Sequence, residues 1–534
     1  MKKARKPPWP LIMLAILCAI TAGSGVLLFG PSAALHIGLA ASTNVLIDGL
    51  AEDPGPHRIM VVDLKVDPAA LDSLNADLPW SGNDAKRAVL TDNGITYKAS
   101  YRYRGLVAGT HYLGGKKSFR LNLKKDNPFA PYRRLNFLNP KANNFLNQHL
   151  AYRIGASMGV AVPYSDLAFV RLNGRDHGVH HVVEQIDGDF ERNRHLIDRD
   201  VPVFKGDNPP AVGRNWPESR YLWVDAHHWS YTSDADSTEA WEKLARLVKL
   251  VGSPSIDDSS RMAGIAALIE VDAFVRYYAV QLVLRSTHAD NVHNQWLVLS
   301  PRSGKFYPVL WDALLLFSRT DPFYPIHDVM EFHLMKDPAL RLRRDRYVME
   351  AIREWEEDGG FDHALDVEAE RALPSVLCDR NKYGEVTGRA QDVLRYSALH
   401  WAGSCDRLRA GVHDYWRKLD ERMRIPTVQV MREADELLVR WNSDGTLGYE
   451  LDADTLRATP VGIPFTSEKK VDDPSVRILP LYRVRHSMGD KPRMIKNGEN
   501  WIAPHELRIR LNGTDPSRIH FINLTTDEPV AVAH

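Results

Sequence analysis

The N-terminal end constrains this chain more than any other feature. Four basic residues (Lys2, Lys3, Arg5 and Lys6) precede an uncharged stretch from Pro10 to Gly30. As a helix, these 21 residues would extend roughly 30 Å, the thickness of a bilayer core. A cleavable signal peptide usually has a shorter apolar region, of about 7–15 residues. The length therefore predicts a retained transmembrane anchor at residues 10–30.

The basic flank also predicts an orientation. Basic residues next to an anchor stay on the cytoplasmic side, so residues 1–9 are expected to form a cytoplasmic tail. The protein is then a single-pass protein of the cytoplasmic membrane with a periplasmic or extracellular ectodomain. The small residues at 39–42 leave cleavage open as an alternative. Scattered Gly, Pro and Ala predict a linker at residues 31–57.

Length, charge and cysteines narrow the class of protein further. A chain of 534 residues predicts two or more domains. The 68 Lys and Arg balance the 68 Asp and Glu, so no nucleic-acid partner is expected. Cys18 falls inside the expected anchor. Cys378 and Cys405 could pair in an oxidising compartment, and two unpaired buried thiols are an equal alternative.

Periodicity predicts a mixed α/β fold up to residue 425. Alternation predicts strands at 58–66, 95–104 and 118–123, and hairpins at 167–184 and 296–310, the first turning at Asn173-Gly174. Helical spacing predicts helices at 145–158, 265–284, 338–357 and 391–423. The helix at 265–284 contains charged residues, which favours a buried helix over a membrane span.

The pattern changes after Pro426. Strands are expected at 437–441, 476–484 and 506–511, with turn signals between them. We therefore expect a small C-terminal β domain at residues 426–534, following a larger domain at residues 58–425.

The residues most indicative of chemistry flank the second hairpin. Asp290 and Asn294 lie in one short polar segment before it, and Asp312 follows it in the sequence Trp-Asp. Phosphoryl transfer requires a carboxylate to orient the attacking hydroxyl, and a second carboxylate, usually with an Asn, to hold the metal. Either segment alone is more typical of a capped turn. Their occurrence on both sides of one hairpin favours a site.

Cations that could bind phosphate come from other segments. Seven of them crowd one strand–turn–strand region: Arg102, Arg104, Lys116, Lys117, Arg120, Lys124 and Lys125. Glu184 ends an apolar strand, and Lys205 follows another apolar stretch. A charged side chain at the end of a buried strand often reaches a pocket. A solvated basic face and an edge ion pair are the alternatives. His227 and His228 are expected to be loop residues, because adjacent side chains point to different sides of a strand.

Several short motifs, in this order, resemble the CotH (spore coat protein H) kinase family between about residues 102 and 424. They are RYRG (102–105), KKSFRLNL (116–123), LNFLNPK (135–141), LNQHLAYRI (146–154), VRLNG (170–174), GVHHVVEQID (178–187), FKG (204–206), DNVHN (290–294) and WD (311–312). The family has a kinase-like mixed α/β core. Its activity is Mg-ATP-dependent phosphorylation of protein Ser or Thr.

The resemblance implies a role for each candidate residue. Asp290 resembles the catalytic carboxylate, and Asn294 and Asp312 resemble the metal ligands. Lys117 and Lys205 resemble phosphate-binding lysines, and Glu184 resembles the acid that orients one of them. Arg104 is a further candidate for binding the cofactor. The expected cofactors are ATP and Mg. The expected partners are a protein substrate or an envelope-complex partner, and the membrane.

Two departures from the family pattern support a rival interpretation. Leu314 stands where the family commonly carries a second acid, two residues after the Trp-Asp aspartate, and the Ser usual after R-x-R-G is absent. ATP is also scarce outside the cytoplasmic membrane. The alternative function is therefore a catalytically impaired scaffold or binding subunit of an envelope or polysaccharide assembly complex.

Overall fold

A computed structural model of the protein divides into two compact units. The first unit comprises Met1–His149, Tyr164–Gln185 and Leu365–Leu408, and the second comprises Leu150–Pro163, Ile186–Ala364 and Arg409–His534. The structure describes residues 55–76, 78, 84–105, 116–124, 126–129, 132–140, 144–194, 196, 198–207, 221–286, 289, 292–315, 328–379, 381, 398–451, 459–460, 476–478 and 505–533.

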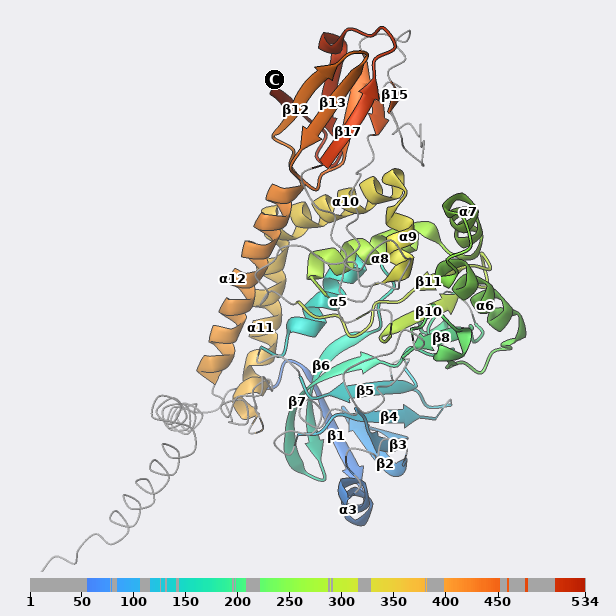
Figure 1. Ribbon diagram of the computed structural model, residues 1–534. Helices are drawn as coiled ribbons and strands as arrows, with labels where there is room; N and C mark the ends of the chain where they lie inside the picture. The colour runs from blue at the N-terminus through green and yellow to red at the C-terminus, as the bar shows by residue number, and fades with distance from the viewer. Residues whose placement is uncertain are drawn as a thin grey trace, which may run out of the picture. The chain divides into compact units, whose positions relative to one another are not determined.

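The core of the first unit is a closed barrel in the order β1-β2-β3-β4-β5-β7-β6 (Figure 1). Its strands are β1 (Met60–Val66), β2 (Lys86–Asp92), β3 (Ile95–Tyr103), β4 (Phe119–Leu123), β5 (Arg134–Leu138), β6 (Ser165–Leu172) and β7 (Arg175–Glu184). β1 pairs with β6 in parallel, and the other neighbours are antiparallel. The short helix α3 (Pro68–Ala76) follows β1.

Alternation explains how the barrel strands bury one face. On β3, Tyr97, Tyr101 and Tyr103 are buried in the barrel core, while Lys98 is exposed. The predicted strands at 58–66, 95–104 and 118–123 correspond to β1, β3 and β4. The predicted hairpin is β6–β7, where Asn173 and Gly174 both have positive φ, as a two-residue turn requires. β2 and β5 were not predicted.

Three helices contain residues of both units. They are α5 (Asn147–Ser157), α11 (Gly360–Cys378) and α12 (Ala398–Met423). α5 and α12 confirm two predicted helices, although residues 391–397 of the second prediction lie outside the described residues. α11 was not predicted. Cys378 and Cys405 do not form a disulfide; Cys405 is buried and Cys378 is half-buried.

The second unit contains a four-stranded antiparallel sheet in the order β11-β10-β8-β9. Its strands are β8 (Val203–Gly206), β9 (Trp229–Tyr231), β10 (Gln295–Leu299) and β11 (Phe306–Pro308). Its helices are α6 (Thr238–Gly252), α7 (Asp258–Leu268), α8 (Val271–Leu284), α9 (Val329–Met335) and α10 (Pro338–Ile352), followed by a π turn at Arg353–Glu357. Short 3-10 turns lie at Arg192–Arg194 and Ala226–His228. The predicted hairpin at 296–310 is β10–β11, and the predicted helix at 338–357 is α10 with its π turn.

The predicted single helix at 265–284 is wrong. The chain leaves helical geometry at Ile269, which has φ −123° and ψ 155°, and the two helices α7 and α8 meet there. Ile269 forms a parallel bridge with Phe306, and the Glu270 N–H donates to the Phe306 carbonyl at 2.8 Å. This pairing with β11 replaces the helical hydrogen bonds, and a local periodicity cannot reveal it.

The C-terminal residues form strands, as predicted. One sheet has the order β15-β17-β13-β12-β20 and the other β16-β14-β18-β19. The strands are β12 (Thr427–Glu433), β13 (Glu436–Trp441), β14 (Leu447–Leu451), β15 (Thr459–Pro460), β16 (Val476–Ile478), β17 (His505–Arg510), β18 (Ile519–Asn523), β19 (Glu528–Pro529) and β20 (Ala531–Ala533), with a 3-10 turn at Pro516–Arg518. They share an apolar core that includes Val439, Tyr449 and Phe521. The boundary at residue 426 stays a prediction.

The predicted anchor at 10–30 and most of the linker lie outside the described residues. Within the part of the chain that the structure describes, no helix is long and apolar enough to cross a membrane.

Candidate functional site

The β10–β11 hairpin brings two predicted metal ligands together. Asn294 immediately precedes β10 and Asp312 follows β11, and the Asn294 Nδ2 donates to the Asp312 Oδ2 at 3.5 Å. Both residues have left-handed backbone angles, with φ of 62° and 52°. Asn and Asp tolerate this conformation better than most residues, and such outliers cluster at functional sites.

The surroundings of Asp312 fix its position. Its backbone N–H donates to the Tyr152 hydroxyl at 3.1 Å. The preceding Trp311 packs against Trp296 of β10, with ring centroids 5.6 Å apart. The Asp312 side chain itself is only half-buried. A hydrogen-bonded backbone therefore presents a partly accessible carboxylate.

Lys205 lies on β8, the strand next to β10. It stands opposite Trp296 in the register, and its Nζ lies 5.9 Å from the centre of that indole ring. The ammonium also contacts the carboxylate of Asp207. Lys205, Asn294 and Asp312 thus belong to one small sheet and its turns.

Sequence reasoning missed a buried carboxylate beside this sheet. Asp328 accepts hydrogen bonds from the Trp223 Nε1 at 2.6 Å and the Tyr278 hydroxyl at 2.7 Å. Burial raises the pKa of Asp328, and a hydrogen bond from Gln295, the residue after Asn294, opposes that rise. No spacing signal marks Asp328, because Trp223 lies 105 residues and Tyr278 50 residues away in sequence.

The two candidate ligands fit magnesium, but they do not form a complete set of protein ligands around a metal ion. Asn294 and Asp312 offer hard oxygen ligands, which Mg²⁺ prefers, and Mg²⁺ is commonly held by one or two carboxylates plus water and phosphate oxygens. Among the described residues, no group of three or more His, Cys, Asp or Glu could hold a metal ion. Leu314, at the position of the family's second acid, is buried with 7% exposure. His227 and His228 lie in the 3-10 turn at Ala226–His228.

The first unit contains the predicted phosphate-binding cations Arg104 and Lys117. The Arg104 N–H, directly after β3, donates to the Ser118 carbonyl at 3.0 Å, which places it beside Lys117. Lys117 is half-buried, and its Nζ lies 5.6 Å from the centre of the Tyr103 ring. Burial lowers the pKa of the Lys117 amine.

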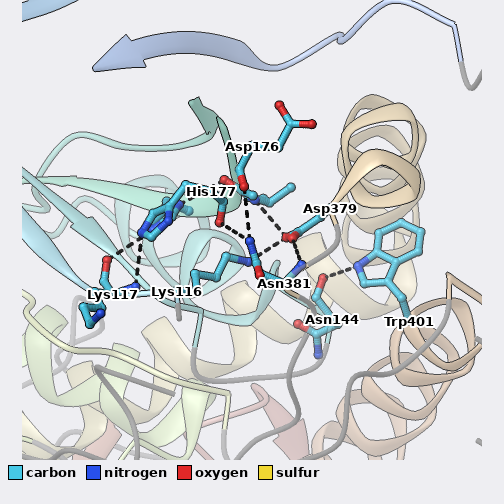
Figure 2. A network of polar contacts seen from close by, with 11 residues as sticks. Lys116, Lys117, Asn144, Asp176, His177, Asp379, Asn381 and Trp401 are labelled. Carbon is cyan, nitrogen blue, oxygen red and sulfur yellow. Dashed lines mark hydrogen bonds and ion pairs between the residues drawn. The ribbon is translucent and has the colours of Figure 1, made fainter. Parts of the chain in front are cut away.

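Two of the seven cations considered for phosphate binding, Lys116 and Arg120, contact other side chains of the first unit. Lys116 is buried with 1% exposure, and its Nζ lies 2.6 Å from the Asp379 Oδ2 (Figure 2). Asp379 is also fully buried. Arg120 donates from Nε to the Asn136 Oδ1 at 2.8 Å. Lys116 and Arg120 therefore make contacts within the first unit. Lys125 lies outside the described residues.

Glu184 ends β7 and is buried. Its Oε2 accepts a hydrogen bond from the Tyr164 N–H at 3.0 Å. Four residues earlier on the same strand, a ring nitrogen of His180 lies 3.3 Å from the Lys117 carbonyl. Four residues of strand span roughly 13 Å, so the backbones of Lys117 and Glu184 are well separated. That Glu184 orients a lysine stays a prediction.

The seven predicted site residues divide among three groups. Arg104, Lys117 and Glu184 belong to the first unit, and the sheet residues Lys205, Asn294 and Asp312 to the second. Asp290, the predicted catalytic carboxylate, lies outside the described residues, and its role stays a prediction.

Comparison with known proteins agrees with the motif pattern. Residues 101–357 match the family described as CotH kinase protein. That segment includes the barrel strands from β4 onward and the β10–β11 hairpin, so the part of the chain with most of the short motifs is similar to the CotH kinase family. No curated protein matches the chain.

Among solved structures, the chain is similar to one in the complex of the toxin–antitoxin proteins HipA and HipB of Shewanella oneidensis MR-1 with their operator DNA. The identity is 11% and the TM-score 0.28, with 54% of this chain and 59% of that chain covered. The chain thus spans about 59% of the length of that solved chain.

Proposed function

We propose that this protein binds Mg-ATP and transfers its terminal phosphoryl group to a hydroxyl of a protein Ser or Thr. The observation that supports it best is the pairing of Asn294 with Asp312 across the β10–β11 hairpin, inside the matched CotH kinase segment. Two oxygen ligands held by left-handed backbone at the ends of one hairpin suit a metal–phosphate complex.

Each residue then has a separable task. Asn294 and Asp312 would hold Mg²⁺, which when bound offsets the negative charge of the phosphates. Lys117 and Lys205 would provide positive charge to the phosphate oxygens, as the family resemblance implies. Asp290 would accept a hydrogen bond from the substrate hydroxyl and orient it. Phosphoryl transfer depends mainly on such positioning and electrostatic stabilisation.

The test is metal-dependent nucleotide binding by the full-length chain. Calorimetric titration with ATP is made once with Mg²⁺ and once with EDTA. We expect binding only with Mg²⁺, and Asp312→Ala should weaken it about tenfold or more, the size of one lost interaction with a charged group. Asp198→Asn, an exposed aspartate of the second unit, is the control. Equal binding by wild type and Asp312→Ala would contradict the proposal.

Catalysis is tested separately from binding. A radiolabelled phosphoryl transfer assay with a generic acceptor protein compares wild type with Asp290→Ala. A group that acts mainly in the transition state lowers turnover more than affinity, so Asp290→Ala should bind Mg-ATP normally and transfer no phosphate. Loss of binding in this variant would contradict its assigned role.

A second candidate is a non-catalytic binding subunit of an envelope assembly complex. The observation that favours it is Leu314, whose buried side chain leaves only Asn294 and Asp312 as described oxygen ligands at this hairpin. Leu314→Asp tests it. Transfer that begins only in this variant would show that the natural chain binds nucleotide without turnover.

The location belongs to the same proposal. The uncharged stretch at 10–30 after four basic residues supports an anchor in the cytoplasmic membrane with the CotH kinase domain outside. Protease protection in spheroplasts tests the orientation, and N-terminal sequencing of the membrane fraction distinguishes a retained anchor from cleavage near Ala41. The expected partners are a protein substrate or an envelope-complex partner.

A further inference from the structure

We propose that Asp379, just after α11, is a positioning residue that fixes the backbone of Lys117 through a buried network with Lys116 and β7. This inference rests on the proposed function, because it assumes that Lys117 meets the nucleotide phosphates. Every residue in the network belongs to the first unit.

In the first part of the network, hydrogen-bond donors surround the Asp379 carboxylate. Its Oδ2 accepts from the Lys116 Nζ at 2.6 Å and from the Val179 N–H at 2.9 Å. Its Oδ1 accepts from the Asn381 N–H at 2.7 Å. Both oxygens therefore have donors, which is what a buried carboxylate requires.

Gly178 makes room for this carboxylate. It has φ of +96°, and a Cβ at this position would lie 2.2 Å from the Asp379 Oδ1. A side chain here would have to displace the aspartate. The glycine that opens the GVHH motif is thus explained by a residue 201 positions further along the chain.

The second part of the network connects β7 to Lys117 (Figure 2). The Lys117 N–H donates to the His177 Nε2 at 3.3 Å, and a ring nitrogen of His180 lies 3.3 Å from the Lys117 carbonyl. Burial lowers the pKa of His177 to about 4, so its ring is neutral at pH 7 and can accept this bond. The Lys117 N–H is therefore held by β7, and the Lys117 carbonyl lies close to the His180 ring on the same strand.

Asn381 closes the network. Its Nδ2 lies 3.3 Å from the carbonyl oxygens of Asp176 and His177, so the chain after α11 is bonded to the same stretch of β7 that holds Lys117. Asp379 acts on Lys117 at two points: through the neighbouring Lys116 and through residues 177–179. A lysine whose backbone is fixed loses less freedom when it binds phosphate.

A pair of matched glycine variants tests the inference on the full-length chain. Gly178→Ala introduces a Cβ against the Asp379 carboxylate, whereas Gly174→Ala has a similar positive φ of +75° with nothing within 4 Å of the new Cβ. Backbone strain is thus common to both, and only the first disturbs Asp379. A second pair of variants removes one carboxylate charge each. Asp379→Asn is compared with Asp166→Asn, because Asp166 pairs with Arg371 elsewhere in the unit.

The readout is the Lys117 side chain itself. Reductive ¹³C-methylation followed by an NMR pH titration gives the pKa of the Lys117 amine, with the signal assigned by Lys117→Arg. We expect Gly178→Ala and Asp379→Asn to move this pKa from its lowered value toward that of a solvated lysine and to weaken Mg-ATP binding about tenfold. Gly174→Ala and Asp166→Asn should change neither.

The outcomes separate this inference from the proposed function. An unchanged Lys117 titration in folded Gly178→Ala or Asp379→Asn would overturn the inference, because the network would then be structural only. A changed titration with unchanged Mg-ATP affinity would support the positioning and would instead contradict the phosphate-binding role of Lys117. If Asp379→Asn does not fold, Asn381→Ala removes only the two side-chain bonds to β7 and is read in the same way.

Discussion

The two units bury charged side chains in different ways. In the first unit, Asp379 and Lys116 form one compact pair, and each carboxylate oxygen accepts a hydrogen bond. In the second unit, Arg344 lies between two buried acids, 2.8 Å from the Asp345 Oδ1 and 3.6 Å from the Glu331 Oε1. The other oxygen of Glu331 is buried with no hydrogen-bond partner among the described residues.

This difference has an electrostatic consequence. A buried ion pair with complete hydrogen bonding offsets much of its desolvation cost, and its loss leaves one charge uncompensated. A buried acid with one unpartnered oxygen is instead favoured in its protonated form. Burial indeed raises the pKa of Glu331 to about 8, although Arg344 opposes the rise. The buried pair of the first unit thus holds Asp379 in place, whereas the raised pKa of Glu331 favours its neutral form near pH 7.

The largest expected effect is the removal of Lys116. Lys116→Met leaves the Asp379 carboxylate buried without its cation, so we expect the free energy of unfolding to fall by about 3–5 kcal/mol. Urea denaturation followed by tryptophan fluorescence measures it. Lys65→Met, an exposed lysine of β1, is the control. A loss of less than about 1 kcal/mol would show that the pair is not a main support of the first unit.

A smaller effect is expected at Glu331, and it depends on pH. The folded state holds its proton up to about pH 8, whereas the unfolded chain releases it near the ordinary value of 4.5. The contribution of Glu331 is therefore complete below pH 4.5 and is lost as the pH rises toward 8. Relative to Glu331→Gln, wild type should lose roughly 2–4 kcal/mol of stability across this range.

Denaturation of both proteins at pH 5 and pH 8 measures this difference. Glu354→Gln, an exposed glutamate of the π turn, is the control and should follow wild type. Parallel pH profiles of wild type and Glu331→Gln would mean that Glu331 is ionised in the folded state, and the contrast between the two units would then disappear.

The same contrast shows what the sequence could predict. Asn294 and Asp312 are 18 residues apart on one hairpin, so strand alternation and turn signals were enough to bring them together. Lys116 and Asp379 are 263 residues apart, and α11, which precedes Asp379, has no strong periodicity. The Lys116–Asp379 pair was therefore not predicted, whereas the role of Glu184 in orienting a lysine stays a prediction.

Long-range pairing also explains the other differences. The expected helix at 265–284 is divided because Ile269 bridges to Phe306 of β11, 37 residues away. Asp328 was missed because its donors, Trp223 and Tyr278, come from distant segments. A periodic pattern reports the face of one element, and it contains no information about which residue of another element meets that face.

The smallest expected effect lies at His413 on α12, an ion-pair site that is partly exposed. Its Nδ1 contacts Glu356 of the π turn, and its Nε2 lies 2.9 Å from the Asp362 Oδ1 of α11. Arg409, one turn earlier on α12, lies 3.4 Å from the same Asp362 oxygen, and the Phe361 ring packs nearby. Burial lowers the pKa of His413, but the two carboxylates outweigh it and raise the pKa above its ordinary 6.5.

A raised pKa in the folded state sets the sign of the pH dependence. The stabilisation by His413 is complete below pH 6.5 and is lost as the pH rises through the folded-state pKa. Because solvent screens a partly exposed pair, we expect about 1 kcal/mol or less between pH 5.5 and pH 8.5, and less still at high salt. Denaturation of His413→Gln should show a correspondingly flatter profile, whereas His363→Gln, an exposed histidine on α11, should follow wild type. A profile for His413→Gln as steep as that of wild type would place the pH dependence elsewhere, since the neutral glutamine cannot form either ion pair.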